Sequence, residues 1–208
     1  MSLRRRMLLV AGAAAKPKYG TFIQDTTGRL WTADEWDGSA TPNGIAVRDK
    51  SHGVTEGILL AIVSSLSMSQ FSTKYFSLEE LGVGTDYLNQ DGYANTQALL
   101  KYSSYLPALM KCISYRFPDG QYGYLGAARE MDLISLCREK IEECLTALGV
   151  TFPSMTTEYV WTSTPSSETT STTLRVRASS VERFVNSLSS STTRYYVWPI
   201  GKVGDWTK

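Results

Sequence analysis

Residues 122–130 read YGYLGAARE, and the apolar pattern that follows them decides the fold. Between residues 127 and 148 apolar side chains recur three or four positions apart, which places them on one face of a single helix. Arg129, Glu130 and Asp132 belong to the charged face opposite, and Gly149 is predicted to end the helix. A helix with one apolar stripe must pack against something, and the flanking regions have strand patterns. The pattern therefore predicts an amphipathic helix on a sheet, in an α+β fold.

The composition is that of an ordinary globular protein rather than a nucleic-acid-binding or membrane-spanning one. The chain has 208 residues, of which 42% are hydrophobic and 20% charged, and its net charge is +1. A charge so close to zero gives no field that would attract nucleic acid. Past the first residues, no apolar run is long enough to span a membrane. We expect neither a nucleic-acid partner nor a membrane span.

The first 18 residues have two interpretations. Arg4, Arg5 and Arg6 precede an apolar run at 7–15, which is the order found in a signal peptide. The alternative, which we favour, is a short extended N-terminal arm over residues 1–18 that becomes ordered on a partner, with the three arginines docking it. Residues 19–208 are then predicted to form one domain, with hairpins at 19–63 and a core at 90–200.

Turn residues and capping residues predict most of the other elements. The cluster at 25–28 should join strands at 20–24 and 29–32 in a hairpin, with further strands at 44–48 and 57–63. Asn95 is predicted to cap a helix at 96–106, and Pro107 to open another through about residue 115.

The last third of the chain is rich in serine and threonine. Residues 162–173 and 187–193 are predicted to be loops at one end of a sheet. Between and after them, alternating or aromatic segments predict three strands, at 174–178, 181–185 and 195–200.

Catalytic and metal-binding patterns are weak in this sequence. The single histidine, His52, falls in a predicted loop, and no nucleophile or phosphate-loop motif accompanies it. Cys112, Cys137 and Cys144 lack the spacing of metal ligands and are expected to be packed, reduced thiols. We therefore expect no enzyme activity, no cofactor and no metal site.

A candidate ligand-binding surface is predicted near the C-terminus. Arginine, aromatic and amide side chains gather there between the Ser/Thr-rich segments, and such a mixture is typical of adaptable recognition surfaces. Tyr196 and Trp198 were expected to help frame this face. The predicted ligand-binding residues are Arg175, Arg177, Arg183, Asn186, Arg194 and Tyr195.

Five short motifs, in order, resemble a family that is widespread in Bacteroidetes and their phages. The sequence is similar to the DUF1566-like group, which is related to the C-type-lectin and formylglycine-generating-enzyme-like folds. The sequence departs from the family pattern at two positions. The family has proline where this chain has Gly126, and arginine where this chain has Trp198. The motifs are DGYANTQ at 91–97, YLGAARE at 124–130, LTALG at 145–149, YVWTST at 159–164 and YVWPI at 196–200.

The resemblance implies a C-type-lectin-like irregular mixed β domain with two or more packed helices. The arginine-rich start is similar to phage proteins, so the first hypothesis is a virion attachment protein: a fibre, capsid-decoration or tail subunit. It would be a homo-oligomer, with a trimer favoured, bound to other virion proteins through the arm and to a host-surface glycan or protein. The alternatives are a secreted or surface-anchored bacterial adhesin of the same fold and, third, an enzyme of the formylglycine-generating type.

Overall fold

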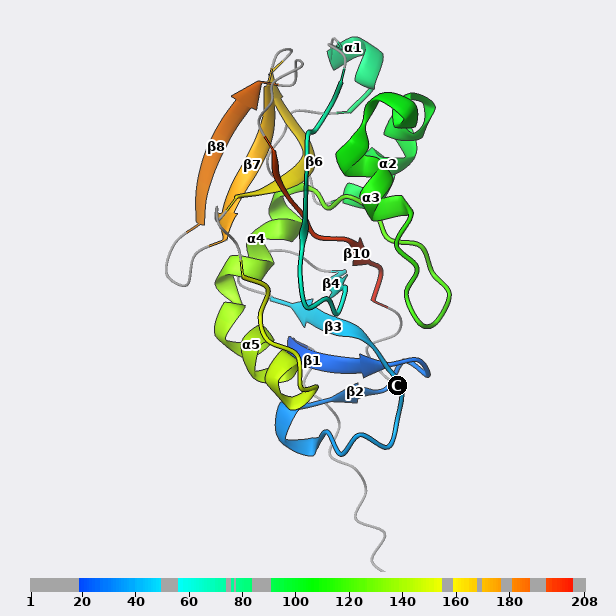
Figure 1. The fold of residues 1–208 in the computed structure, drawn as a ribbon, viewed down its shortest axis with the longest axis vertical. Helices are drawn as coiled ribbons and strands as arrows, with labels where there is room; N and C mark the ends of the chain where they lie inside the picture. The colour runs from blue at the N-terminus through cyan, green and yellow to red at the C-terminus, as the bar shows by residue number, and fades with distance from the viewer. Residues whose placement is uncertain are drawn as a thin grey trace, which may run out of the picture.

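Strands from both ends of the chain build two sheets with helices on their flanks (Figure 1). The computed structural model describes residues 19–49, 56–73, 76, 78–83, 91–154, 159–167, 170–176, 181–187 and 194–203. For residues 78–79, 166–167, 170–176 and 181–187 it describes the backbone alone. The predicted arm with Arg4, Arg5 and Arg6 lies outside these residues, as does His52. None of the helices in the described ranges is long and apolar enough to cross a membrane.

The first sheet contains the predicted N-terminal hairpin. Its strands run in the order β10-β4-β3-β1-β2, and each neighbouring pair is antiparallel. Asp25 fixes the hairpin turn, because its Oδ1 accepts hydrogen bonds from the backbone N–H of Thr27 at 2.8 Å and of Arg29 at 3.1 Å. The prediction of this hairpin is confirmed. The strands are β1 (Gly20–Asp25), β2 (Leu30–Trp31), β3 (Pro42–Arg48), β4 (Ile58–Leu60) and β10 (Ile200–Gly201).

The second sheet contains the Ser/Thr-rich segments. Its strand order is β5-β9-β6-β7-β8, with all pairs antiparallel except β6 with β9. The prediction that residues 162–173 form a loop is wrong, because most of them are in two long paired strands. Threonine is β-branched and suits a strand. In β6 the Ala128 N–H donates to the Thr164 hydroxyl and the Asn95 amide donates to the Ser163 hydroxyl. The strands are β5 (Ser67–Ser69), β6 (Tyr159–Ser167), β7 (Thr170–Val176), β8 (Val181–Ser187) and β9 (Tyr195–Val197).

The predicted long helix is two helices, α4 (Ala128–Leu136) and α5 (Arg138–Ala147), separated at Cys137. Cys137 leaves helical geometry with φ −106° and ψ 16°. The break lets α4 pack against β6, β7 and β8 while α5 packs against β1 and β3, so the pair bridges the two sheets (Figure 1). Gly149 ends α5 as predicted, with φ +71° and with the Val150 N–H bonded to the Leu145 carbonyl at 2.8 Å.

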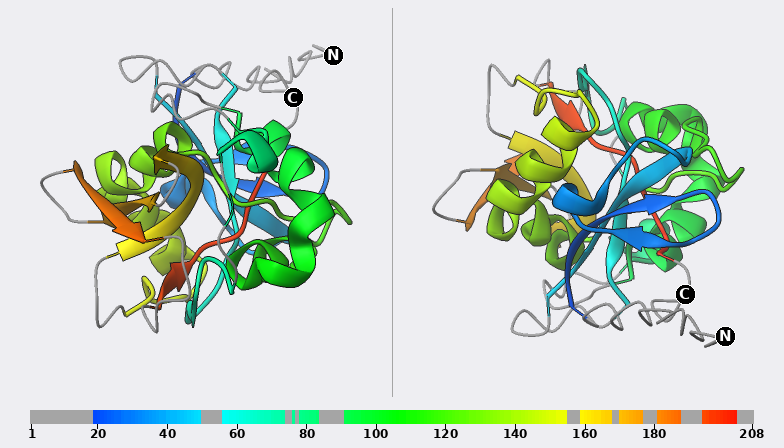
Figure 2. Two further views of the ribbon diagram at one scale, coloured as in Figure 1. Left: turned by 90° about the horizontal axis from the view of Figure 1, so that it is seen from above. Right: turned by 90° about the horizontal axis from the view of Figure 1, so that it is seen from below.

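The other helices lie on the opposite flank. In both views of Figure 2, α2 and α3 are on one side of the strands and α4 and α5 on the other. Asp91 caps α2 by accepting from the Ala94 N–H at 2.8 Å, so the prediction that Asn95 is the cap is wrong. Pro107 opens α3 as predicted. The remaining elements are α1 (Leu78–Leu81), α2 (Gly92–Leu99), α3 (Pro107–Ile113) and the 3₁₀ helices η1 (Ala33–Glu35) and η2 (Leu100–Tyr105).

The core consists of two clusters among the described residues. The larger lies between the first sheet and α4–α5, and the smaller lies under α2 and α3 against Trp161 and Val197. Cys112 and Cys144 are buried in these clusters, and all three cysteines are free thiols, as expected from their spacing. Burial raises the pKa of Cys144 to about 11 and that of Cys112 further, so both stay protonated at neutral pH. The fold class, α+β, is confirmed.

Candidate functional site: a buried junction and an aromatic groove

Three of the five sequence motifs meet in one buried polar cluster, which we call the junction. The carboxyl group of Glu130 is its centre. Oε2 accepts hydrogen bonds from the backbone N–H of Ala127 at 2.8 Å and of Gly92 at 3.1 Å, and Oε1 accepts one from the hydroxyl of Tyr124 at 3.0 Å. Glu130 is only 5% exposed. One side chain thus ties the start of α2 to the start of α4.

The remaining junction contacts connect these helices to β6. Thr164 Oγ1 accepts from the Ala128 N–H at 3.0 Å, which supplies the helix cap that Ala127 cannot provide from its own methyl side chain. The Asn95 amide donates to the Ser163 hydroxyl at 3.2 Å, and the Ser163 N–H donates to the Gly126 carbonyl at 2.8 Å. The side chains of Asn95, Tyr124, Glu130, Ser163 and Thr164 therefore find hydrogen-bond partners within these motifs.

The prediction that two acidic residues near the junction lie on an exposed helix face is wrong. Glu130 and Asp132 were assigned to the solvated face of the helix, yet they are 5% and 1% exposed. The helix is covered on that side as well, because α4 packs against three strands while backbone and hydroxyl donors satisfy Glu130. Arg129 lies 4.0 Å from Asp132 as an ion-pair partner. Helical spacing alone does not reveal this second covering layer.

Burial makes the junction carboxyl sensitive to pH. It raises the pKa of Glu130 to about 7, against the opposing effect of the hydrogen bonds from Ala127, Tyr124 and Gly92. Burial, together with the nearby Glu130, also raises the pKa of Tyr124 well above its usual value. The Tyr124 hydroxyl therefore keeps its proton over the whole range in which Glu130 titrates.

We expect the protein to lose stability as the pH rises through this range. Between 4.5, the ordinary pKa of Glu130, and its folded-state value of about 7, the folded protein holds a proton that the unfolded chain has released. The free energy of unfolding should therefore fall with rising pH, by roughly 3 kcal/mol. Glu130→Gln imitates the protonated acid, since its carbonyl can accept from both N–H groups while its amide donates to Tyr124.

Urea unfolding of both proteins at about pH 5 and about pH 8 measures this dependence. The wild type should be less stable at the higher pH, and the difference in stability between wild type and Glu130→Gln should change by roughly the amount above. A difference that is the same at both pH values would contradict the assignment of this titration to Glu130.

A groove runs along the outer side of the junction, and we call it the tyrosine groove. Its volume is about 560 Å³. Tyr93, on the first turn of α2, is 40% exposed, and Tyr122 is 64% exposed. The Tyr93 ring meets Tyr124 edge to face at 5.8 Å and carries Lys202 Nζ 3.9 Å from its centroid. The lining residues are Tyr93, Thr96, Gln97, Leu100, Ile113, Gln121, Tyr122, Gly123, Tyr124 and Lys202.

The polar side chains that line the tyrosine groove are hydroxyls, amides and one ammonium group rather than carboxylates, among the described residues. Lys202 is the charged side chain in its lining as far as the structure describes it, and no carboxylate joins it there. Gln121 is held in place, donating to Asp119 at 2.9 Å and accepting from the Lys202 N–H at 3.0 Å. Gln97 is exposed and its amide bonds to none of the described residues. The groove can therefore offer flat rings, one free amide and one ammonium group to a ligand.

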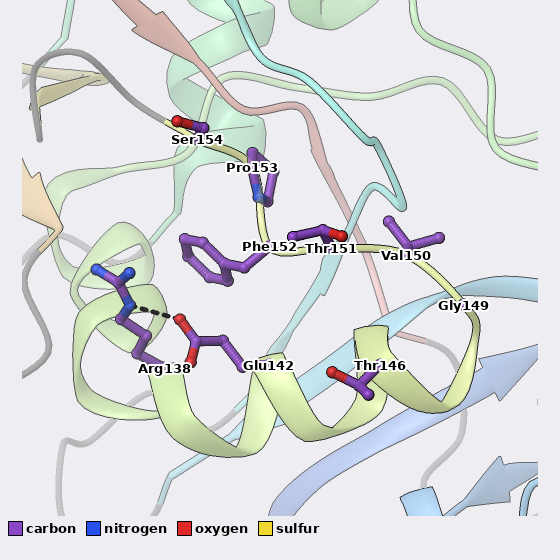
Figure 3. Close-up of a pocket in the computed structure, with 9 residues that line it drawn as sticks. All are labelled: Arg138, Glu142, Thr146, Gly149, Val150, Thr151, Phe152, Pro153 and Ser154. Atoms are coloured by element: carbon purple, nitrogen blue, oxygen red, sulfur yellow. Dashed lines mark hydrogen bonds and ion pairs between the residues drawn. The ribbon is translucent and has the colours of Figure 1, made fainter.

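Two other cavities are less suited to a ligand. The groove in Figure 3 lies between α5 and residues 149–154, and its charged groups are already used. Arg138 Nε donates to Glu142 Oε1 at 2.8 Å, and the guanidinium lies 4.5 Å from the Phe152 ring centroid. The contact between the Arg138 guanidinium and the Phe152 ring fastens residues 149–154 to α5. A third cavity, lined in part by Leu66, Met110 and Pro199, separates β5 from α3.

The predicted ligand-binding residues that the structure describes lie in or next to three strands of the second sheet, β7, β8 and β9. Arg175 is in β7, which pairs with the edge strand β8, where Arg183 and Asn186 lie. These three are described by their backbone alone, and Arg177 is outside the described residues. Arg194 is exposed, and Tyr195 is half-buried against Tyr159 and Trp161. Their role in binding stays a prediction.

Two aromatic residues expected at that surface are core residues instead. Tyr196 and Trp198 are 5% and 1% exposed. The Trp198 indole N–H donates to the Ala61 carbonyl at 3.1 Å, and its ring packs against Phe152 at 5.5 Å. Trp198 is thus a packing residue of the core.

Glycine at position 126 has a packing explanation. A Cβ at this position would meet Met131 Sδ at 2.6 Å and Ile200 Cδ1 at 2.7 Å. Met131 fills the space that a larger residue at 126 would need.

The tyrosine groove is not predicted by the sequence patterns. Tyr93 and Tyr122 are 29 positions apart and belong to segments that only the junction brings together. A signal was present, because each lies next to a glycine of the chain, Gly92 or Gly123, that packs closely against another backbone segment. Within the described residues, no group of three or more histidine, cysteine or acidic side chains could hold a metal ion.

Comparison with known proteins gives a likeness in fold. No family model and no curated protein matches the sequence. Among solved structures, the chain is similar to a fimbrial protein from Bacteroides ovatus, with a TM-score of 0.54 and 15% sequence identity. The match covers 91% of this chain and 46% of the fimbrial protein, so the chain spans less than half of that protein's length. At this identity the likeness concerns the fold alone.

Proposed function

We propose that this chain is an attachment domain that binds a ligand at a cell surface without transforming it. The observation that carries the proposal is the tyrosine groove. It presents the exposed rings of Tyr93 and Tyr122 on a rigid base, and among its described lining residues there is no acid–base pair. Flat aromatic rings with few polar groups are typical of binding sites that recognise rather than react.

The fold supports the same proposal. We propose that it is C-type-lectin-like, with the α4–α5 pair bridging two sheets and β6 capping the helix that starts at the YLGAARE motif. In such a scaffold the junction supports the surfaces on either side of it. The β7–β8 strands with Arg175, Arg183 and Asn186 are then a second proposed ligand-binding surface, separate from the tyrosine groove.

Between the two biological settings, a bacterial surface appendage is the first candidate. The fold is similar to that of a fimbrial protein, which favours an adhesin or a related subunit. A virion attachment protein is the second candidate, favoured by the similarity of the arginine-rich start to phage proteins. Both settings need a surface ligand, and both would allow an oligomer.

Binding to intact cells tests the proposal. Purified fluorescent protein should bind Bacteroides cells, the genus of the structural neighbour, in a saturable manner that unlabelled protein displaces. Immunogold labelling of the native source then separates the settings, since an adhesin decorates cells or filaments whereas a virion protein decorates particles. An absence of displaceable binding to the cells tested would overturn the attachment role.

A further inference from the structure

We propose that the tyrosine groove is a saccharide site, which takes a pyranose unit of a surface glycan against the rings that line it, among them those of Tyr122 and Tyr93. This proposal rests on the attachment function above and names its ligand class. It begins with Tyr122, which is 64% exposed although hydrogen bonds close the turn that carries it. An aromatic side chain held rigidly in solvent provides contact area at little entropic cost to binding.

The loop that carries Tyr122 is fastened on both sides. Asn43 in β3 donates to Asp119 Oδ2 at 2.8 Å and accepts from the Asp119 N–H at 3.0 Å. The Phe117 N–H donates to the Gln121 carbonyl at 2.9 Å, which closes the turn before Tyr122. The ring is therefore presented by a preformed turn rather than by a flexible loop.

Tyr93 also lines the groove, and the junction holds its segment in place. Its neighbour Gly92 donates to Glu130 in the junction, and its own ring packs edge to face with Tyr124. Lys202 lies over the Tyr93 ring at 3.9 Å, so one ring face is covered by a cation that can also donate to a ligand. The two tyrosines thus belong to segments that hydrogen bonds within the protein hold in place.

The polar groups match the hydroxyls of a sugar. A pyranose has C–H faces that stack on the electron-rich face of an aromatic ring, and an equatorial belt of hydroxyls that need donors and acceptors. Gln97 supplies an amide with both functions, and Lys202 supplies a donor. The volume of about 560 Å³ is in the range of small-ligand sites and exceeds what one pyranose needs.

Other ligand classes fit the groove less well. A peptide adding a strand would need a free edge, but Tyr124 is already paired with Ile200, with N–H···O distances of 2.8 and 3.2 Å. A nucleic acid would need several cations, whereas Lys202 is alone in the described lining. A hydroxyl-rich ligand with apolar faces remains the best match.

The test uses surface polysaccharide extracted from the same Bacteroides cells and cut to oligosaccharides. Saturation-transfer NMR and titration calorimetry with the wild-type chain should detect binding to these fragments. Tyr122→Ala should weaken binding by about tenfold, and Gln97→Ala by a smaller factor. Tyr105→Ala is the matched control, because Tyr105 is 45% exposed but lies outside the groove.

Two results would overturn the saccharide proposal. One is the absence of binding to any fragment by wild-type protein; the other is equal binding by Tyr122→Ala and Tyr105→Ala. Periodate oxidation of the cells separates this inference from the attachment function. If wild-type protein binds untreated and oxidised cells equally, attachment stands and the saccharide site is wrong. If fragments bind but cells do not, the saccharide site stands and the attachment function is wrong.

Discussion

Glu130→Ala is expected to lower the free energy of unfolding by at least about 3 kcal/mol. The substitution removes the acceptor for three donors at once, the Gly92 and Ala127 N–H groups and the Tyr124 hydroxyl. Each buried donor left without a partner costs about 1–3 kcal/mol. For a domain of this size the midpoint of thermal unfolding should fall by about 10 °C.

Thermal and urea unfolding measure this effect directly. Glu143→Ala is the matched control, since Glu143 is exposed and pairs with Lys140, three positions earlier on α5. An exposed pair of this kind is worth about 0–1 kcal/mol, so the control should unfold close to the wild type. If the two alanine variants had the same stability, Glu130 would not be the centre of the junction.

Gly92→Ala is expected to be as damaging, for a steric reason. An added Cβ would overlap the Ala127 nitrogen and Glu130 Oε2, and would meet the Gly126 carbonyl carbon at 2.8 Å. Two of these contacts are backbone atoms, which cannot move aside as the end of a flexible side chain would. We expect a loss of about 3 kcal/mol or more, or no folded protein at all.

A control in the same helix separates this clash from helix propensity. Ala94→Gly makes the reverse exchange two positions later, at an exposed site in α2, and should cost about 1 kcal/mol. Circular dichroism and thermal unfolding compare the two variants. A Gly92→Ala protein with the wild-type unfolding midpoint would show that the α2 and α4 starts are not in the close contact described.

Local signals in the sequence predicted the elements whose ends are set by neighbouring residues. Asp25 in the hairpin turn, Pro107 at the start of α3 and Gly149 at the end of α5 all act within a few positions of themselves. The prediction of Asn95 as a helix cap was wrong because Asp91 takes that role and leaves the Asn95 amide for Ser163. Either side chain could cap a helix by its local chemistry. The packing of β6, which places Ser163 beside Asn95, decides between them.

The junction and the groove could not be derived from spacing because their contacts are long-range. Glu130 bonds to Gly92 across 38 positions, and Thr164 caps α4 from 36 positions away. The break at Cys137 also depends on long-range contacts, because α4 packs against the second sheet and α5 packs against the first. The motifs that suggested the lectin-like resemblance contain the residues of these contacts, but they do not locate the groove.

The most direct test of the account is the cell binding of a folded groove variant. Tyr122→Ala combined with Gln97→Ala changes two exposed side chains of the tyrosine groove and leaves the junction intact. With an unfolding midpoint within about 2 °C of wild type, this variant should lose most of its displaceable binding to cells, while Tyr105→Ala keeps it. Full binding by the folded double variant would contradict the assignment of the tyrosine groove as the attachment site.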